Sequence, residues 1–279
     1  MRMPNVRFLL MSAPMQIATL DGRRTSYRIA GDACASRTIV LVHAFPVGAG
    51  MFAPQEEAFP GWKVVIPALP GFDGSDLNPQ PTIDAYAAGI LRLLDHLQVD
   101  RAVFAGVSLG GYLMFGVLRL HPQRVRAMVL ADTRSAADAP EARAGRDKLL
   151  QTARTKGPAA IADEMLPKLL GESTRTRRPQ VADAVRRMIE GQTPEGIAAA
   201  VQVLMSRPDS TPLLPAVTVP TLVVVGREDT LTPPAEMERM AGGIAGARFV
   251  QIDEAGHLAN LENPSAFNAE VNSLLTSLT

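Results

Sequence analysis

The chain of 279 residues has little cysteine, no excess of either charge and no long apolar run. Cys34 is the single cysteine, so no disulfide can form within the chain, and a reducing compartment, the cytoplasm, is expected. No run of about 18 apolar residues occurs, which argues against a transmembrane helix and a membrane partner. Because 28 basic residues balance 28 acidic ones, no nucleic-acid partner is expected, and a homodimer is compatible with the zero net charge.

The first residues contain a short apolar stretch, residues 8–11, behind two arginines. It is shorter than the roughly 7–15 residues of a secretory signal core. Residues 1–14 are therefore predicted to be a loose leader.

Short apolar, β-branched segments alternate with amphipathic segments along most of the chain. We expect strands at residues 15–20, 24–29, 38–42, 63–67, 102–106, 127–131, 222–225 and 249–252. Helical periodicity predicts helices over residues 83–97, 109–120, 233–240 and 265–275. This alternation predicts an α/β fold with a mostly parallel central sheet flanked by helices.

The alternation stops at residues 134–213, where no strand-like segment occurs. Helices are expected there over residues 140–155, 158–170, 179–190 and 194–206, separated by glycine and proline. Residues 1–133 and 214–279 would then form the core. Residues 134–213 would form an all-helical cap, inserted between two strands at the sheet edge where ligands bind.

The segment Gly106-Val107-Ser108-Leu109-Gly110 reads G-x-S-x-G. It lies between a buried strand and a helix, the context of a nucleophile elbow. The tight turn requires small flanking residues and raises the Ser108 hydroxyl above the sheet. Ser108 is the candidate nucleophile.

A serine hydroxyl needs a base, and the chain has four histidines. His257 follows the last predicted strand, which places it at the same sheet edge as Ser108. His96 lies on an amphipathic helix, and His121 precedes a proline at a helix end. His43 begins the loop expected to stabilise the oxyanion. His257 is the predicted base, with His43 as the alternative.

The base needs an orienting carboxylate, and Asp229 follows the preceding strand. The order serine, aspartate, histidine along the chain favours it. Glu228 should point the other way. Asp132 is a second candidate, and Asp253 a third that lies too close to His257 along the chain.

Two backbone N–H groups should stabilise the oxyanion. The Leu109 N–H directly follows the nucleophile, and the Phe45 N–H comes from the loop after the strand at 38–42. His43 would hold that loop. No metal or organic cofactor is needed, because no clustered metal-ligand spacing occurs.

Four motifs now stand in order along the chain: His43-Ala44-Phe45-Pro46, Gly106-Val107-Ser108-Leu109-Gly110-Gly111, Gly226-Arg227-Glu228-Asp229 and Gly256-His257. In this order the chain resembles the α/β-hydrolase fold superfamily from about residue 16 to 276. Within it the chain is similar to small serine esterases and lactonases, including 3-oxoadipate enol-lactonases and acyl-homoserine lactonases. Ala44 stands where the family usually has glycine. Ala68 stands where it usually has aspartate before Leu-Pro-Gly-Phe-Gly, a motif that continues here into Asp73.

These features predict hydrolysis of a small-molecule carboxylic ester or lactone through an acyl-enzyme. Apolar side chains of the substrate pocket are expected at Met51, Met165, Leu169 and Met188. No arginine can be singled out as a carboxylate clamp, which disfavours an acidic substrate. The rivals are a thioesterase, a cofactor-free perhydrolase or haloperoxidase, a C–C bond hydrolase and a non-catalytic ligand receptor.

Overall fold

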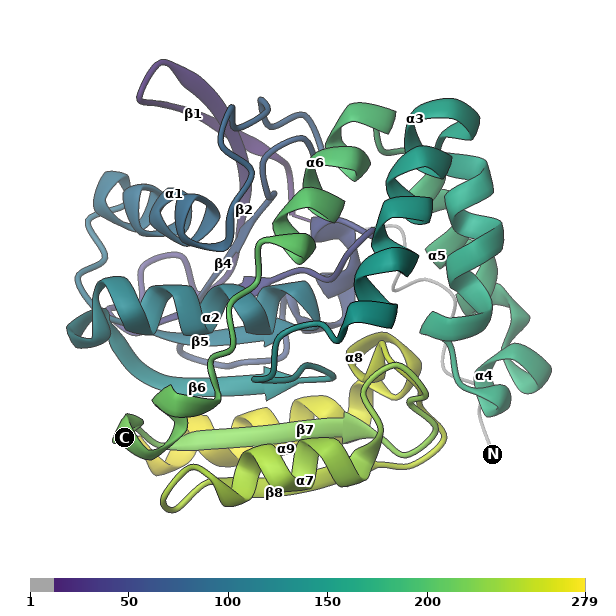
Figure 1. The fold of residues 1–279 in the computed structure, drawn as a ribbon. Helices are drawn as coiled ribbons and strands as arrows, with labels where there is room; N and C mark the ends of the chain where they lie inside the picture. The colour runs from purple at the N-terminus through teal and green to yellow at the C-terminus, as the bar shows by residue number, and fades with distance from the viewer. Residues whose placement is uncertain (1–12, 279) are drawn as a thin grey trace.

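The computed structural model describes residues 13–278 and is built around one eight-stranded sheet (Figure 1). The strands are β1 Gln16–Leu20, β2 Arg23–Gly31, β3 Thr38–Val42, β4 Lys63–Pro67, β5 Ala102–Val107, β6 Val125–Ala131, β7 Thr221–Gly226 and β8 Arg248–Ile252. Their order is β1-β2-β4-β3-β5-β6-β7-β8. The pairs β1–β2 and β2–β4 are antiparallel, and the other pairs are parallel. The predicted α/β fold and each predicted strand are confirmed within a few residues.

The central strands are apolar because both of their faces are covered. Every residue of β3 and β5 is buried, and their register pairs Val40 with Phe104 and Val42 with Gly106. Helix α1, Ile83–His96, packs on α2, Leu109–Leu120, which packs on β5 and β6. Helices α7, Pro234–Gly242, and α9, Pro264–Ser277, lie on the two sides of β7 in Figure 1.

Four helices follow β6 and precede β7: α3 Pro140–Leu169, α4 Glu172–Arg177, α5 Pro179–Glu190 and α6 Pro194–Met205. We refer to them as the helical insertion. The predicted break at Gly157 is present, since its φ of 76° interrupts the helical backbone of α3. Helix α4 was not predicted. The parallel strands point toward this insertion, which lies beside their carboxyl ends (Figure 1).

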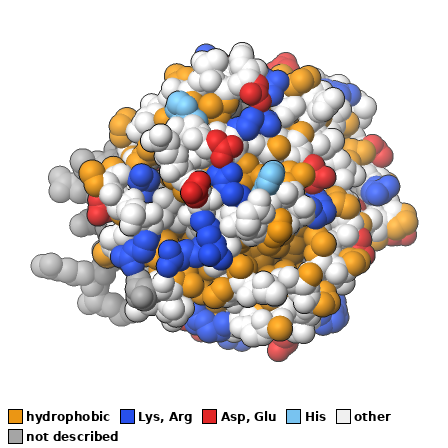
Figure 2. All heavy atoms as spheres, turned by 90° about the vertical axis from the view of Figure 1, so that its left-hand side faces the viewer, with side chains coloured by type: hydrophobic (Ala, Val, Ile, Leu, Met, Phe, Trp, Pro, Cys, Tyr) orange, Lys and Arg blue, Asp and Glu red, His pale blue; other side chains and the backbone are white. Residues whose placement is uncertain are grey.

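The remaining elements are short. They comprise the 3₁₀ segments η2 Ala49–Gln55, η3 Pro122–Arg124 and η4 Thr211–Ala216, and the helix α8 Ala259–Glu262. On the face shown in Figure 2, basic and acidic side chains are interspersed among hydrophobic ones. No helix within residues 13–278 has the length and apolar character needed to cross a membrane. Residues 1–12 of the predicted leader lie outside the described residues, whereas the Ala13 N–H donates to Glu56 at 2.6 Å.

Candidate active site

Ser108 lies in the sharp turn between β5 and α2. Its φ of 53° is in the left-handed region, which non-glycine residues rarely adopt outside functional turns. The turn is possible because a Cβ at Gly106 would collide with Gly110, and a Cβ at Gly110 would collide with the Val42 carbonyl. The sequence therefore places glycine at both positions and leaves Ser108 at the end of the strand.

A continuous hydrogen-bonded chain joins Ser108, His257 and Asp229. The Ser108 Oγ lies 2.8 Å from the His257 Nε2, and the His257 Nδ1 lies 2.8 Å from an Asp229 carboxylate oxygen. All three residues are less than 10% exposed. Because an ionised carboxylate can only accept, the Nδ1 carries the hydrogen and the Nε2 is free to accept from the Ser108 hydroxyl.

The surroundings of Asp229 keep it ionised. Burial raises the pKa of this carboxyl, but the charge of His257 and several hydrogen bonds outweigh burial and hold the pKa below its ordinary value. The donors are the N–H groups of Leu231 and Thr232, at 2.8 and 3.0 Å, and the Thr232 hydroxyl. Burial lowers the pKa of His257, but the Asp229 carboxylate outweighs it, and the net pKa is raised.

The other candidate carboxylates lie elsewhere. Asp132 is fully buried beside this chain and accepts from the N–H groups of Gly226 and Ala259, at 2.8 and 3.2 Å. Burial, and secondarily the Asp229 charge, raises the pKa of Asp132 to about 8. Glu228 points away, as expected, and accepts from Ser173 of the helical insertion. Asp253 is exposed and pairs with Arg227 at 2.5 Å.

His43 is not part of the hydrogen-bonded chain. Its Nε2 accepts from the Leu69 N–H at 3.0 Å, and its Nδ1 lies 3.1 Å from the Ala44 carbonyl. Both ring nitrogens are therefore occupied, and burial lowers the pKa of the imidazole. This geometry fits a side chain that holds the loop after β3. His96 and His121 are exposed at the surface.

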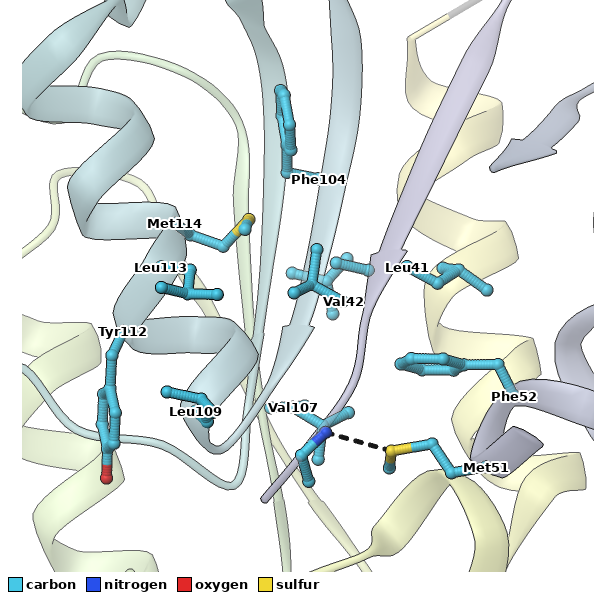
Figure 3. Close-up of a cluster of buried hydrophobic side chains, with 14 of the residues drawn as sticks. Leu41, Val42, Met51, Phe52, Phe104, Val107, Leu109, Tyr112, Leu113 and Met114 are labelled. Carbon is cyan, nitrogen blue, oxygen red and sulfur yellow. Dashed lines mark hydrogen bonds between the residues drawn. The ribbon is translucent and has the colours of Figure 1, made fainter. Parts of the chain in front are cut away.

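The two candidate oxyanion donors have free N–H groups. Within residues 13–278, neither the Phe45 N–H nor the Leu109 N–H donates a hydrogen bond to another group. The neighbouring Ala44 N–H donates to the Met51 sulfur at 3.1 Å (Figure 3). Ala44 is accommodated in this loop, where its N–H is bound by the buried Met51.

A cavity of about 390 Å³ opens over Ser108 and His257. Phe45 and Tyr112 line it on the core side. The segment from β6 through α6 adds the largest share of the wall, through Arg134, Asp138, Ala142, Gly145, Arg146, Leu149, Glu164, Met165, Lys168, Leu169 and Leu204.

Two of the four residues predicted for the substrate pocket, Met165 and Leu169, lie on this wall, but Met51 and Met188 do not. Met51 is fully buried and lies across the end of β3 from Tyr112 in Figure 3. Met188 packs near Gly50, on the η2 side. The sequence could not distinguish these positions, because an apolar side chain packs equally well against a core or a pocket.

The wall carries charged side chains, whereas the residues predicted for the pocket are all apolar. Arg134, Arg146 and Lys168 line the cavity together with two acidic residues. Arg146 lies 3.2 Å from Asp138, whose other oxygen binds the buried Arg207 at 2.5 Å. The sequence alone did not identify these arginines as pocket residues. Arg134 follows β6 closely enough to have been a candidate, whereas Arg146 depends on how α3 is turned.

Proteins of known structure or function are similar to this chain in fold and sequence. An esterase from Thermogutta terrifontis, solved with malate bound, superposes with a TM-score of 0.90 and 37% identity, covering 95% of this chain and 99% of that one. The enol-lactonase from Burkholderia xenovorans LB400 superposes with a TM-score of 0.86 and 31% identity, covering 94% and 100%. The 3-oxoadipate enol-lactonase 2 of Acinetobacter baylyi is 29% identical over 194 residues, 69% of this chain and 70% of that protein.

The family described as alpha/beta hydrolase fold matches residues 37–264, which span the sheet from β3 to β8 and the helical insertion. The match includes Ser108, Asp229 and His257, and the relatives are named as esterases and enol-lactonases. The predicted resemblance is confirmed: the chain belongs to the alpha/beta hydrolase fold family.

Proposed function

We propose that the protein is a serine hydrolase that cleaves carboxylic esters or lactones through an acyl-enzyme. The observation that carries the proposal is the continuous hydrogen-bonded chain from Ser108 to Asp229, which opens onto a cavity large enough for a small acyl group. Ser108, His257 and Asp229 would then form a catalytic triad.

In this mechanism His257 accepts the Ser108 proton at Nε2 while the oxygen attacks the carbonyl carbon. The Phe45 and Leu109 N–H groups donate to the oxyanion, each contributing about 3–4 kcal/mol to stabilising the transition state. His257 then protonates the leaving oxygen. It next removes a proton from water, whose oxygen attacks the acyl carbon, and returns this proton to the Ser108 oxygen as the acyl–Ser108 bond breaks and the acid leaves.

We further propose that the helical insertion acts as the cap of residues 134–213 on a core of residues 1–133 and 214–279. Its wall residues, which include Met165 and Leu169, would hold the acyl or alkyl group and limit the access of water. The cytoplasm as compartment and a homodimer as assembly stay predictions, which cell fractionation and light scattering test.

The cavity favours substrates with a negatively charged group away from the scissile bond. Arg134 pairs with Glu236 and Lys168 with Glu164, at 3.5 Å each. Asp138 is shared by Arg146 and the buried Arg207, which leaves one positive charge in excess beside the cavity. A carboxylate would pair with the excess cation. From the sequence alone, an acidic substrate is disfavoured; the charges around the cavity favour one. Enol-lactones and N-acyl-homoserine lactones are the specific alternatives within the proposal.

The test is hydrolysis by the wild type and Ser108→Ala across p-nitrophenyl esters, γ-butyrolactones and N-acyl-homoserine lactones. Matched esters with and without a free carboxylate complete the panel. We expect turnover that depends on Ser108 and a higher kcat/KM for the acidic member of each pair. Turnover that survives Ser108→Ala would contradict the mechanism.

The same preparation separates the rivals. Halogenation with peroxide and halide would indicate a perhydrolase, and cleavage of diketones but not esters would indicate a C–C bond hydrolase. Preference for acyl thioesters would indicate a thioesterase. Tight ligand binding without turnover would indicate a receptor.

A further inference from the structure

The loop that carries His257 lies directly against the helical insertion where α3 ends. The His257 N–H donates to the Leu169 carbonyl at 3.0 Å. A Cβ at Gly256 would collide with the backbone nitrogen of Gly171, so no side chain fits between the two backbones. Since Leu169 lines the cavity, the main chain of His257 is joined to the cavity wall.

Glu262, at the end of α8, spans both sides of this contact. One carboxylate oxygen accepts from the N–H groups of Gly256 and Leu258, at 2.8 and 3.2 Å. The other accepts from the Gly171 N–H at 2.8 Å. A single side chain, 1% exposed, thus holds the residues before and after His257 and Gly171, the residue that precedes α4.

The surroundings of Glu262 suit a group that only accepts. Burial raises the pKa of this carboxyl above its ordinary value, and hydrogen bonds from Thr174 and the three N–H groups offset only part of that rise. Arg178 brings a positive charge to the same corner, donating to the Glu262 main-chain carbonyl and to the Thr174 hydroxyl. A glutamine would turn an amide NH₂ toward one of these donors and lose at least one hydrogen bond.

We propose that Glu262 is a positioning residue that fixes the backbone of His257 to the end of α3 and so sets the distance from His257 to Ser108. Asp229 orients the imidazole ring, whereas Glu262 holds the main chain that carries the ring. This inference rests on the proposed function, in which His257 is the base. Weakening the bonds of Glu262 should lower kcat and leave KM nearly unchanged, because the substrate still meets the same cavity wall.

The test compares Glu262→Gln with Glu56→Gln, a matched control. Glu56 is equally buried, but it binds Arg28 and the Ala13 N–H and has no hydrogen bond to the His257 loop. Active sites are titrated with a fluorophosphonate, so that kcat refers to titrated sites. We expect Glu262→Gln to lower this kcat by about 10- to 100-fold and to change KM by less than about threefold. Glu56→Gln should keep the wild-type kcat even if its melting temperature falls.

A second readout follows the hydrogen between His257 Nδ1 and Asp229 by proton NMR. Its resonance should shift or broaden in Glu262→Gln and stay unchanged in Glu56→Gln. Glu262→Asp, which restores the charge on a shorter side chain, should recover part of kcat. If Glu262→Gln does not fold, Glu262→Asp and Thr174→Val should show smaller losses of kcat.

Wild-type kcat per titrated site in these Glu262 and Thr174 variants, with an unchanged resonance, would overturn the positioning role. Lack of Ser108-dependent turnover in the wild type would instead contradict the proposed function. The NMR comparison would then still decide whether Glu262 positions His257.

Discussion

The two parts of α3 on either side of Gly157 build the same cavity wall but are held very differently. The first part, residues 140–156, buries only Leu149 and Ala153. The second part, residues 158–169, buries Ile161, Ala162, Met165, Leu166 and Leu169. It ends beside Gly171, where Glu262 and the His257 loop bind it.

The wall of the cavity therefore combines a fixed piece, residues 158–169, and a weakly held piece, residues 140–156. The fixed piece lies next to the candidate chemistry, where small displacements are costly. The weakly held piece carries Arg146, and its few buried side chains predict a lower local stability than that of the fixed piece. Changes near the fixed piece should therefore alter kcat or stability, and changes in the other piece should alter KM.

The largest effect on kcat is expected at Asp229, which binds the imidazole of His257 beside the fixed piece. Asp229→Asn should lower kcat by about 10⁴-fold, because the amide can donate toward Nδ1 and favour the wrong tautomer. The acidic limb of the pH profile should also move to lower pH, since the charge that raises the pKa of His257 is lost. Steady-state kinetics from pH 5 to 9 measure both, and wild-type kcat in this variant would remove Asp229 from the mechanism.

A pair of glycine substitutions compares the two pieces directly. At Gly171 a Cβ would lie 2.5 Å from the Glu228 carboxylate and 2.9 Å from the Gly256 nitrogen. Gly171→Ala should therefore destabilise the protein by about 1–3 kcal/mol and lower kcat. At Gly145 a Cβ meets nothing within 4 Å, so Gly145→Ala should stabilise α3 by up to about 1 kcal/mol. Denaturant unfolding measures the change in the free energy of unfolding for both variants. Equal changes would contradict the inference that the two pieces of α3 are held differently.

Arg146→Gln should affect substrate binding alone. We expect KM for a carboxylate-bearing ester to rise about tenfold, the loss expected for one hydrogen bond to a charged group, with kcat unchanged. The uncharged ester should show no such change. Arg143→Gln, an exposed neighbour that does not line the cavity, is the control. An equal loss for both esters would argue against a charge contact.

The last effect is on the pH dependence of stability and concerns the core side of the site, where Asp132 joins the end of β7 to the start of α8. Its pKa is raised from 3.8 to about 8, so the folded state binds its proton more tightly than the unfolded state. Its contribution to stability therefore falls as the pH rises from about 4 to about 8. Asp132→Asn should flatten this dependence, which urea unfolding across the range measures. An unchanged slope would show that another group causes it.

Much of the fold and of the candidate site was predictable because the signals are local. The apolar run before Ser108 and the glycines around it specify a strand, a tight turn and a helix within a dozen residues. Asp229 and His257 each follow a parallel strand, and parallel strands end at one edge of the sheet. Their meeting with Ser108 was therefore expected before any contact was known.

The pocket was harder to predict. Met51 and Met165 look alike in the sequence, yet one binds the Ala44 N–H in the loop after β3 and the other lines the cavity. The difference depends on which side of each element meets the core, and periodicity alone does not decide this for short segments. Arg146 was missed for the same reason, whereas Arg134 follows β6 closely enough to have been a candidate.

The sequence by itself determined the succession of strands and helices along the chain and the tight turn at Ser108. It also determined the type and order of the two residues, Asp229 and His257, that form a hydrogen-bonded chain with Ser108. Only the tertiary structure decided what surrounds them. Glu262 and Gly171 are 91 residues apart, and nothing local marks either as a partner of His257. Their contact exists because packing the insertion on the core brings unpaired backbone N–H groups to a buried carboxylate. Such groups must find an acceptor wherever the fold places them.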